Sequence, residues 1–220
     1  MYKISDLYDL SYTIAADYLR QFTHPWEALP GIKAMVAELG ETLGEEYRQV
    51  SPQVWVHKDA TIAPTAYLGA PCIIGPGTQV RHCAFIRGAA LVGAGCVIGN
   101  SVELKNVILF DKVQVPHYNY VGDSILGHKA HLGAGAVTSN VKSDKTLVVI
   151  HGEQEIPTGI KKVGALIGDD VEVGCNSVLN PGTVIGRSSN VYPLSCVRGV
   201  IPENSIYKTG GVIAPKVEGK

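Results

Sequence analysis

Large apolar residues recur at every sixth position over residues 60–114, a spacing that fits neither an α-helix nor an ordinary strand. All nine are large and apolar: Ile62, Leu68, Ile74, Val80, Ile86, Val92, Ile98, Leu104 and Phe110. An α-helix brings every third or fourth residue to one face, and a strand alternates every second residue. A period of six instead predicts a coil with three short sides, in which each aliphatic residue stacks on one a full turn away. An ordinary sandwich with chance spacing is the alternative.

The period predicts an all-β fold, a parallel β-helix over residues 53–205, and it breaks in two places. The first break is "VQVPHYNYVGDSILG", residues 113–127, after which the pattern restarts at Tyr120, Leu126 and Leu132. We expect the broken turn to let His117 point outward. The second break, residues 139–162, predicts an inserted loop or hairpin, and inserts in repeat proteins often lie on the binding face.

The first 52 residues lack the six-residue period and predict a short helical segment. Ala15, Ala16 and Leu19 fit one helix, and a second fits Ile32, Met35, Val36 and Leu39. Because the end of a solenoid needs a cap, we expect this segment, residues 1–52, to cover the first coils. Residues 206–220 are expected to form a C-terminal tail.

Composition narrows the class of protein further. The formal net charge is −1, with 19 basic and 20 acidic residues, so no basic field is available for nucleic acid. The five cysteines form no CxxC pair, and the N-terminus has no cleavage pattern, which predicts reduced thiols and a cytoplasmic location. No apolar run approaches the roughly 20 residues of a membrane span.

A series of short motifs matches one known family in order and spacing. They are Arg87, "GNSVELK" (99–105), "HYNYVGDSILG" (117–127), "HLGAGAVTSN" (131–140) and "IGDDVEVG" (167–174). On these motifs the chain resembles the left-handed β-helix hexapeptide acyltransferases over roughly residues 60–200. It is most similar to the C-terminal acetyltransferase domain of the bifunctional enzymes that make UDP-N-acetylglucosamine. The resemblance implies that the coil is left-handed.

The resemblance also implies a reaction, the transfer of an acetyl group from acetyl-CoA to the amino group of a hexosamine 1-phosphate. In that family a histidine at the place of His117 is the general base, and Asn140 matches an asparagine that positions the amine and the thioester. Imidazole suits the role because it titrates near neutral pH and the attacking amine must lose a proton. No metal is implied, since a thioester is already activated. Taken alone, His117 could be a surface histidine and Asn140 a turn residue.

Further residues are implied to hold the sugar phosphate: Arg87, Lys105, Tyr120, His131 and Lys162. Arg87 and Lys105 are 18 residues apart, which on a three-sided coil returns the chain to the same face one turn later. Two cations so placed suit a phosphate dianion, although each alone would pass for a solvated charge. Tyr120 alone would pass for a core residue.

The chain departs from the family at two positions, His131 and Val141, where asparagine and tyrosine are usual. The preference between glucosamine and galactosamine 1-phosphate therefore stays open. Coenzyme A is implied to run between coils against backbone groups at Ala134 and Cys175. The family assembles as trimers with sites between subunits, so we expect a homotrimer.

Two rival functions remain open at this point. A γ-class carbonic anhydrase shares the coil and would bind zinc through His117, His128 and His131, or through His82 on an earlier turn, with an open position for water. The other rival is a non-catalytic assembly module of a sugar nucleotidyltransferase system. The bifunctional relatives begin with a nucleotidyltransferase domain, but residues 1–59 contain no glycine-rich, arginine-containing loop, so no uridylyltransferase activity is predicted.

Overall fold

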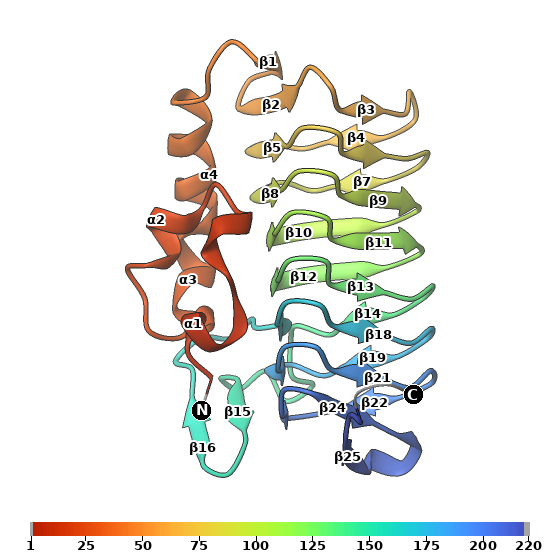
Figure 1. Ribbon diagram of the computed structural model, residues 1–220. Coiled ribbons are helices and arrows are strands. Elements are labelled where there is room, and N and C mark those ends of the chain that lie inside the picture. The colour runs from red at the N-terminus through yellow and green to blue at the C-terminus, as the bar shows by residue number, and fades with distance from the viewer. Residues whose placement is uncertain (1, 218–220) are drawn as a thin grey trace.

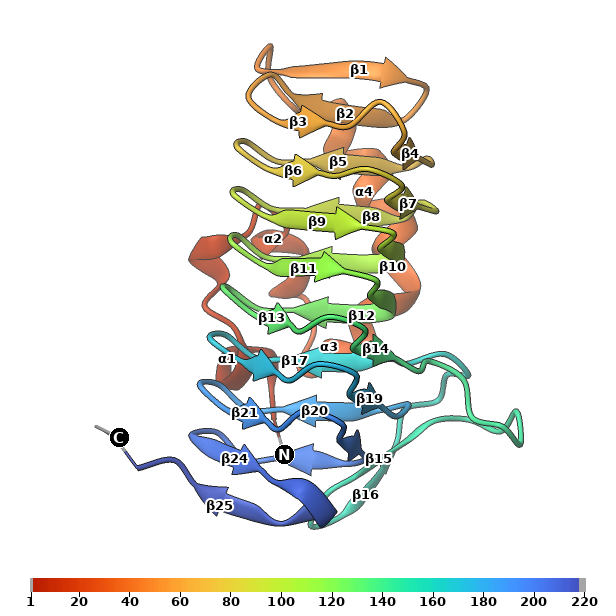
Figure 2. The ribbon, with the colours of Figure 1, turned by 90° about the vertical axis from the view of Figure 1, so that its right-hand side faces the viewer.

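A computed structural model describes residues 2–217 and shows a stack of three-sided β coils with short helices along one flank (Figures 1 and 2). Strands of neighbouring coils pair in parallel, which confirms the predicted all-β solenoid. The left-handed sense of the coil stays a prediction. Within the described residues, no helix has the length and apolar character needed to cross a bilayer.

Each coil contributes one short strand to each of three sides. The first side contains β2 (Val54–His57), β5 (Cys72–Ile74), β8 (Ala90–Val92), β17 (Ala165–Ile167), β20 (Thr183–Ile185) and β23 (Val200–Ile201). The second contains β3 (Thr61–Ile62), β6 (Gln79–Val80), β9 (Val97–Asn100), β11 (Gln114–His117), β13 (His131–Leu132), β18 (Glu172–Val173), β21 (Asn190–Val191) and β24 (Ser205–Tyr207). The third contains β4 (Tyr67–Leu68), β7 (Phe85–Ile86), β14 (Val137–Thr138), β19 (Val178–Leu179) and β22 (Cys196–Val197). Two longer strands, β10 (Glu103–Leu109) and β12 (Tyr120–Leu126), run from the third side into the first.

The core is the column that the six-residue period predicts. From Ile74 to Leu104 every predicted large apolar residue is buried, and each stacks on its counterpart in the next coil, as Ile74 does on Val92. The small residues two positions earlier, such as Ala90 and Cys96, are buried as well. Burial of aliphatic side chains at about 25 cal/mol per Å² is the main stabilising term of such a stack.

The predicted break in residues 113–127 does contain a shortened corner, between Val121 and Ser124, but the prediction that the period breaks at His117 is wrong. Strand β11 pairs in regular register with β9, His117 lying beside Asn100. The coil loses a residue earlier, because Leu104 pairs with Ile86, 18 residues before it, whereas Val107 pairs with Ala90, only 17 residues before it.

The lost residue lies at one corner, between the third and the first side. The next coil is shortened at the same place, so Val107 pairs with Ser124, again 17 residues apart. Because one corner residue is missing in each coil, β10 and β12 continue through the corner as single strands. The inward column therefore passes through Val121, which pairs with Leu104, and not through Tyr120 as predicted.

The N-terminal helices lie along the first side of the coil instead of capping its end (Figure 1). They are α1 (Ile4–Leu7), α2 (Ala16–Leu19), α3 (Pro25–Ala28) and α4 (Ile32–Glu41), with 3-10 turns η1 (Leu10–Tyr12) and η2 (Leu29–Gly31). Helix α4 contacts β5, β8 and β10, and the Tyr2 hydroxyl accepts a hydrogen bond from the backbone of Glu203 in the last coils. The outermost strand at this end of the stack is β1 (Tyr47–Ser51), which pairs antiparallel with β2 of the first coil.

The insert and the C-terminal end both form antiparallel pairs. Within residues 139–162, β15 (Val149–His151) and β16 (Glu155–Pro157) make a hairpin that projects beside the lower coils (Figure 2). The predicted boundary at 205/206 falls inside β24, which pairs with β21 and with β25 (Ile213–Pro215). An η3 turn (Thr209–Gly211) joins these last strands.

Candidate functional site

The shortened corner carries a compact polar cluster around the carboxylate of Asp123. This side chain is only 6% exposed and accepts hydrogen bonds from Lys105 at 3.0 Å and from Asn106 at 2.9 Å. The amide of Asn140, from the following coil, also donates to it. Asn106 and Asp123 both have positive φ, a conformation in which Asn and Asp are enriched. Because the corner is one residue shorter, the polar side chains of Asn106, Asp123 and Asn140, from successive coils, lie directly on one another.

Arg87 and Tyr120 lie next to this cluster on the third side. The Arg87 guanidinium donates to Glu103 at 2.8 Å, with 46% of the arginine side chain exposed. That hydrogen bond raises the pKa of Arg87. Burial, followed by the nearby charge of Asp123, raises the pKa of Tyr120, so its hydroxyl stays protonated at neutral pH. This hydroxyl accepts a hydrogen bond from Asn140 at 3.3 Å.

Four predicted residues are therefore brought together: Arg87, Lys105, Tyr120 and Asn140. Sequence reasoning missed their partners Glu103, Asp123 and Asn106. The first two lie inside motifs already singled out, "GNSVELK" and "HYNYVGDSILG", but nothing in their spacing showed that they pair with the cations. Arg87 and Lys105, the two cations predicted to bind a phosphate, therefore each already contact a carboxylate.

His117 lies at a different corner, between the second and third sides, three residues before Tyr120. The side chain is exposed, and its backbone N–H donates to the side chain of Asn119 at 3.1 Å. Asn119 is buried, and its amide donates to the carbonyls of Gly133 and Ala136. This buried amide fixes the backbone of the corner and leaves the imidazole facing solvent.

The predicted coenzyme positions line up below His117. Its carbonyl accepts from the N–H of Gly135, and the carbonyl of Ala134 accepts from Asn176, the neighbour of Cys175. The corners that hold His117, Ala134 and Cys175 thus stack on successive coils, and Cys175 is exposed. The three residues therefore lie on one edge of the coil.

Two other predicted residues occupy different surroundings. His131 lies at the start of β13 and contacts Glu172 at 2.6 Å, apart from the Asp123 cluster. Lys162 is exposed, and its backbone forms an isolated antiparallel β-bridge with Val141, the residue after Asn140.

The zinc arrangement of the carbonic anhydrase alternative does not form within one chain. His128 is buried and stacks on Tyr12, with ring centroids 3.7 Å apart, while His82 contacts Thr65. Over residues 2–217 no group of three or more His, Cys, Asp or Glu side chains is placed to hold a metal ion.

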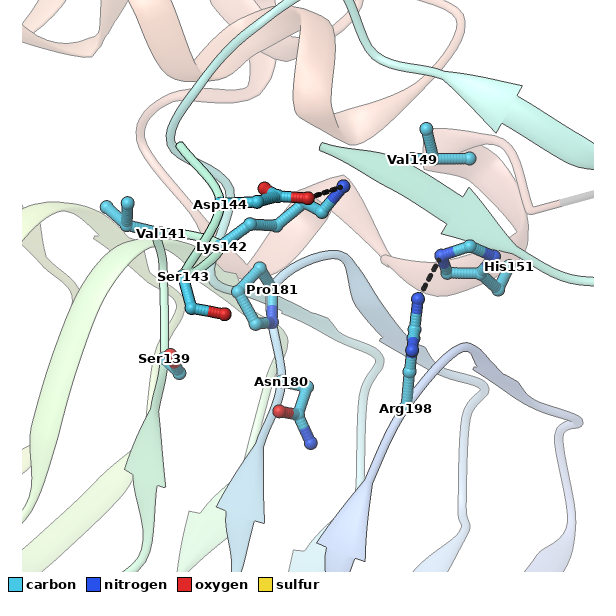
Figure 3. A pocket seen from close by; sticks show the side chains of 10 residues that line it. All are labelled: Ser139, Val141, Lys142, Ser143, Asp144, Val149, His151, Asn180, Pro181 and Arg198. Atoms are coloured by element: carbon cyan, nitrogen blue, oxygen red, sulfur yellow. Dashed lines mark hydrogen bonds and ion pairs between the residues drawn. The ribbon is translucent and has the colours of Figure 1, made fainter. Parts of the chain in front are cut away.

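The lining of a polar cavity of about 440 Å³ includes Ser139 and Val141, the sequence neighbours of Asn140 (Figure 3). Its floor comes from successive coils through Ser139, Asn180 and Arg198, and its wall from the insert. Arg198 donates to Nε2 of His151 at 2.9 Å, and Nδ1 of His151 lies 3.1 Å from Glu155. Since a guanidinium only donates, Nε2 is the acceptor, and the proton of a neutral ring is on Nδ1, toward Glu155.

Comparison with known proteins finds bifunctional enzymes among the relatives of this chain. The chain is 28% identical over 205 residues to a bifunctional protein GlmU of Methanococcus maripaludis, covering 90% of this chain and 49% of that protein. It is 28% identical over 196 residues to a bifunctional sugar-1-phosphate nucleotidylyltransferase/acetyltransferase of Sulfurisphaera tokodaii, covering 87% and 49%. The chain thus spans about half the length of these curated relatives. The resemblance inferred from the motifs is confirmed.

Among solved structures, the acetyltransferase domain of PglB from Neisseria gonorrhoeae aligns with 85% of this chain and 66% of that chain, at 14% identity and a TM-score of 0.37. A family model described as the GMPPB C-terminal domain matches residues 71–209. This match covers more than half of the chain and most of its coils. The chain therefore belongs to the GMPPB C-terminal domain family.

Proposed function

We propose that the chain is an acetyl-CoA-dependent N-acetyltransferase that acts on an amino-sugar 1-phosphate in nucleotide-sugar synthesis. The observation that carries the proposal is the convergence of Arg87, Lys105, Tyr120 and Asn140 on one shortened corner, with His117 exposed on the same coil as Tyr120. The names of the relatives, which include a sugar-1-phosphate nucleotidylyltransferase/acetyltransferase, support the same reaction class.

In the proposed reaction the sugar amine attacks the thioester carbonyl of acetyl-CoA. A carbon–nitrogen bond forms, the carbon–sulfur bond breaks, and the thiolate of coenzyme A leaves and takes up a proton. His117 accepts the proton that the nitrogen loses, which is the task of a general base. Asn140 holds the amine and thioester in reach of one another, and the donor lies against Ala134 and Cys175.

The phosphate is assigned to Arg87 and Lys105, assisted by the Tyr120 hydroxyl. An incoming phosphate competes with Glu103 and Asp123 for these cations, and its larger charge and three oxygens favour it over a single carboxylate. Lys162 and His131 are assigned to the sugar. Because His131 lies apart from the corner in one protomer, its contact is proposed to be with a sugar held by a neighbouring chain.

A homotrimer is part of the proposal, and the third side of the coil supports it. Tyr67 and Phe85 pair on this side with 60% and 43% of their surfaces exposed. Val178, which is 37% exposed, lies on the same side beyond Glu103, Tyr120 and Val137. The rings of Tyr67 and Phe85 contact each other at an angle of 56°, with centroids 5.5 Å apart. Exposed apolar residues gathered on one side of the coil support an interaction surface there, and a second copy placed on it would cover Tyr120, which lies on the same side next to Glu103.

The test is release of free coenzyme A thiol from acetyl-CoA, screened over amino-sugar 1-phosphates, with His117→Ala alongside. We expect activity on at least one sugar and a loss of about 100-fold or more in kcat for the variant, the range of general base catalysis. Equal rates for variant and wild type would remove His117 as the base. No turnover and no binding of acetyl-CoA would favour the non-catalytic assembly module instead.

A further inference from the structure

Helix α4 of the N-terminal segment lines the same cavity as Arg87 and Lys105. A cavity of about 320 Å³ lies beside the two cations, and its lining includes Lys33 together with Arg87, Lys105 and Asn106. Lys33 stands in the first turn of α4, far from the others in sequence. The six-residue coil therefore supplies only part of this cavity, and the helical segment supplies the rest.

The charges around the cavity give Lys33 a distinct role. Arg87 and Lys105 each contact a carboxylate, Glu103 and Asp123, so those four charges sum to zero. Among the described residues Lys33 takes part in no salt bridge within 4.0 Å and is exposed. Once Glu103 and Asp123, the partners of Arg87 and Lys105, are counted, the net positive charge of the cavity lining comes from Lys33.

A hydrogen-bonded path fixes the start of α4 against the corner. The amide of Asn106 donates to the carbonyl of Leu29 at 3.1 Å and to Asp123 at 2.9 Å, and Asp123 in turn accepts from Lys105. Ile32 and Val36, on the buried face of α4, are fully buried. The same carboxylate that holds Lys105 therefore also holds, through one amide, the segment that carries Lys33.

We propose that Lys33 is a third phosphate-binding residue, so that the N-terminal segment forms part of the substrate site and selects for a phosphorylated sugar. The inference rests on the proposed function, because it takes the sugar 1-phosphate as the ligand of Arg87 and Lys105. A phosphate dianion meets two cations that are already neutralised and one that is not, which makes Lys33 the main source of net attraction. Removing one charge-assisted hydrogen bond of this kind lowers affinity about 10- to 100-fold.

The experiment compares Lys33→Met and Lys33→Arg with wild type, and uses Lys112→Met as the matched control. Lys112 is also an exposed lysine outside the salt bridges of the described residues, but it lies at another corner. We expect Lys33→Met to raise KM for the hexosamine 1-phosphate about 10- to 100-fold. The KM for acetyl-CoA and the melting temperature should stay unchanged, Lys33→Arg should remain within about threefold of wild type, and Lys112→Met should have no effect.

Two further arms separate the possible failures. With the unphosphorylated amino sugar, wild type and Lys33→Met should have the same kcat/KM, because the contact is to the phosphate. An unchanged KM for the phosphorylated sugar in Lys33→Met would overturn the inference while leaving the proposed function intact. If wild type turns over no amino-sugar phosphate, the proposed function fails. Thermal shift with inorganic phosphate then decides the role of Lys33: stabilisation of wild type but not of Lys33→Met supports it, and equal shifts, or none in either protein, refute it.

Discussion

Replacing Asp123 by asparagine tests the role of the shortened corner. The substitution keeps the shape of the side chain and its tolerance for positive φ, which Asp123 adopts at +48°. It removes the one negative charge to which Lys105, Asn106 and Asn140 all donate. The new amide NH₂ group then faces at least one of these donors, and Lys105, only 25% exposed, loses its counter-ion.

The expected cost follows from burial. Breaking a buried ion pair by removing one partner costs about 3–5 kcal/mol, and because the asparagine oxygen still accepts one bond we expect about 2–4 kcal/mol here. For a chain of this length that corresponds to a fall in melting temperature of about 4–16 °C. The matched control is Glu103→Gln, which breaks the neighbouring exposed pair with Arg87 and should cost less than about 1 kcal/mol.

The assay is thermal and urea unfolding followed by circular dichroism for both variants. A melting temperature of Asp123→Asn equal to that of Glu103→Gln would refute the argument that Asp123 holds the corner together. The double variant Lys105→Met/Asp123→Asn supplies a further check. It should be more stable than Asp123→Asn alone, because it no longer contains a half-buried ammonium without a partner.

Three further predictions concern other parts of the molecule. Burial raises the pKa of the Cys72 and Cys96 thiols to about 12, so a thiol reagent at pH 8 should label only the three exposed cysteines quickly, and all five after unfolding. Gly99→Ala should prevent folding or cost several kcal/mol, because its Cβ would lie 1.5 Å from a carbonyl oxygen of the next coil, whereas Gly44→Ala, with open space around it, should melt like wild type. Burial also raises the pKa of Tyr8 well above its ordinary value near 10; the stability due to its neutral form is present below pH 10 and is lost as pH rises further, so Tyr8→Phe should lose less stability between pH 9 and pH 11 than wild type.

Much of the fold could be read from the sequence because its cause is local and repetitive. Each six-residue unit forms one side, and the residue that points inward is set by its position in the unit, so Ile74 and Ile98 were placed correctly without knowledge of any contact. The helix α4 was predicted for the same reason, since Ile32 and Val36 recur at helical spacing.

The candidate site was predicted only in part. Arg87, Lys105 and Asn140 were found through motifs, and their common corner follows from the register of the coil. The first shortened corner, between Leu104 and Val107, was missed because Phe110 is apolar and continued the six-residue pattern past it, and the predicted break beside His117 contains only the second shortened corner. Only pairing of Val107 with Ala90 located the break at the corner of Lys105.

The sequence by itself determined the three-sided coil, the inward column and the identity of the motif residues, because each depends on spacing within or between adjacent repeats. The tertiary structure alone decided that Asp123 and Glu103 neutralise the two cations and that Lys33 joins them from a helix. Those contacts link residues 16 to 72 positions apart through packing of α4 against the coil and through one shortened corner. The six-residue period cannot predict such contacts, because they depend on how α4 packs against the coil and not on the spacing of neighbouring residues.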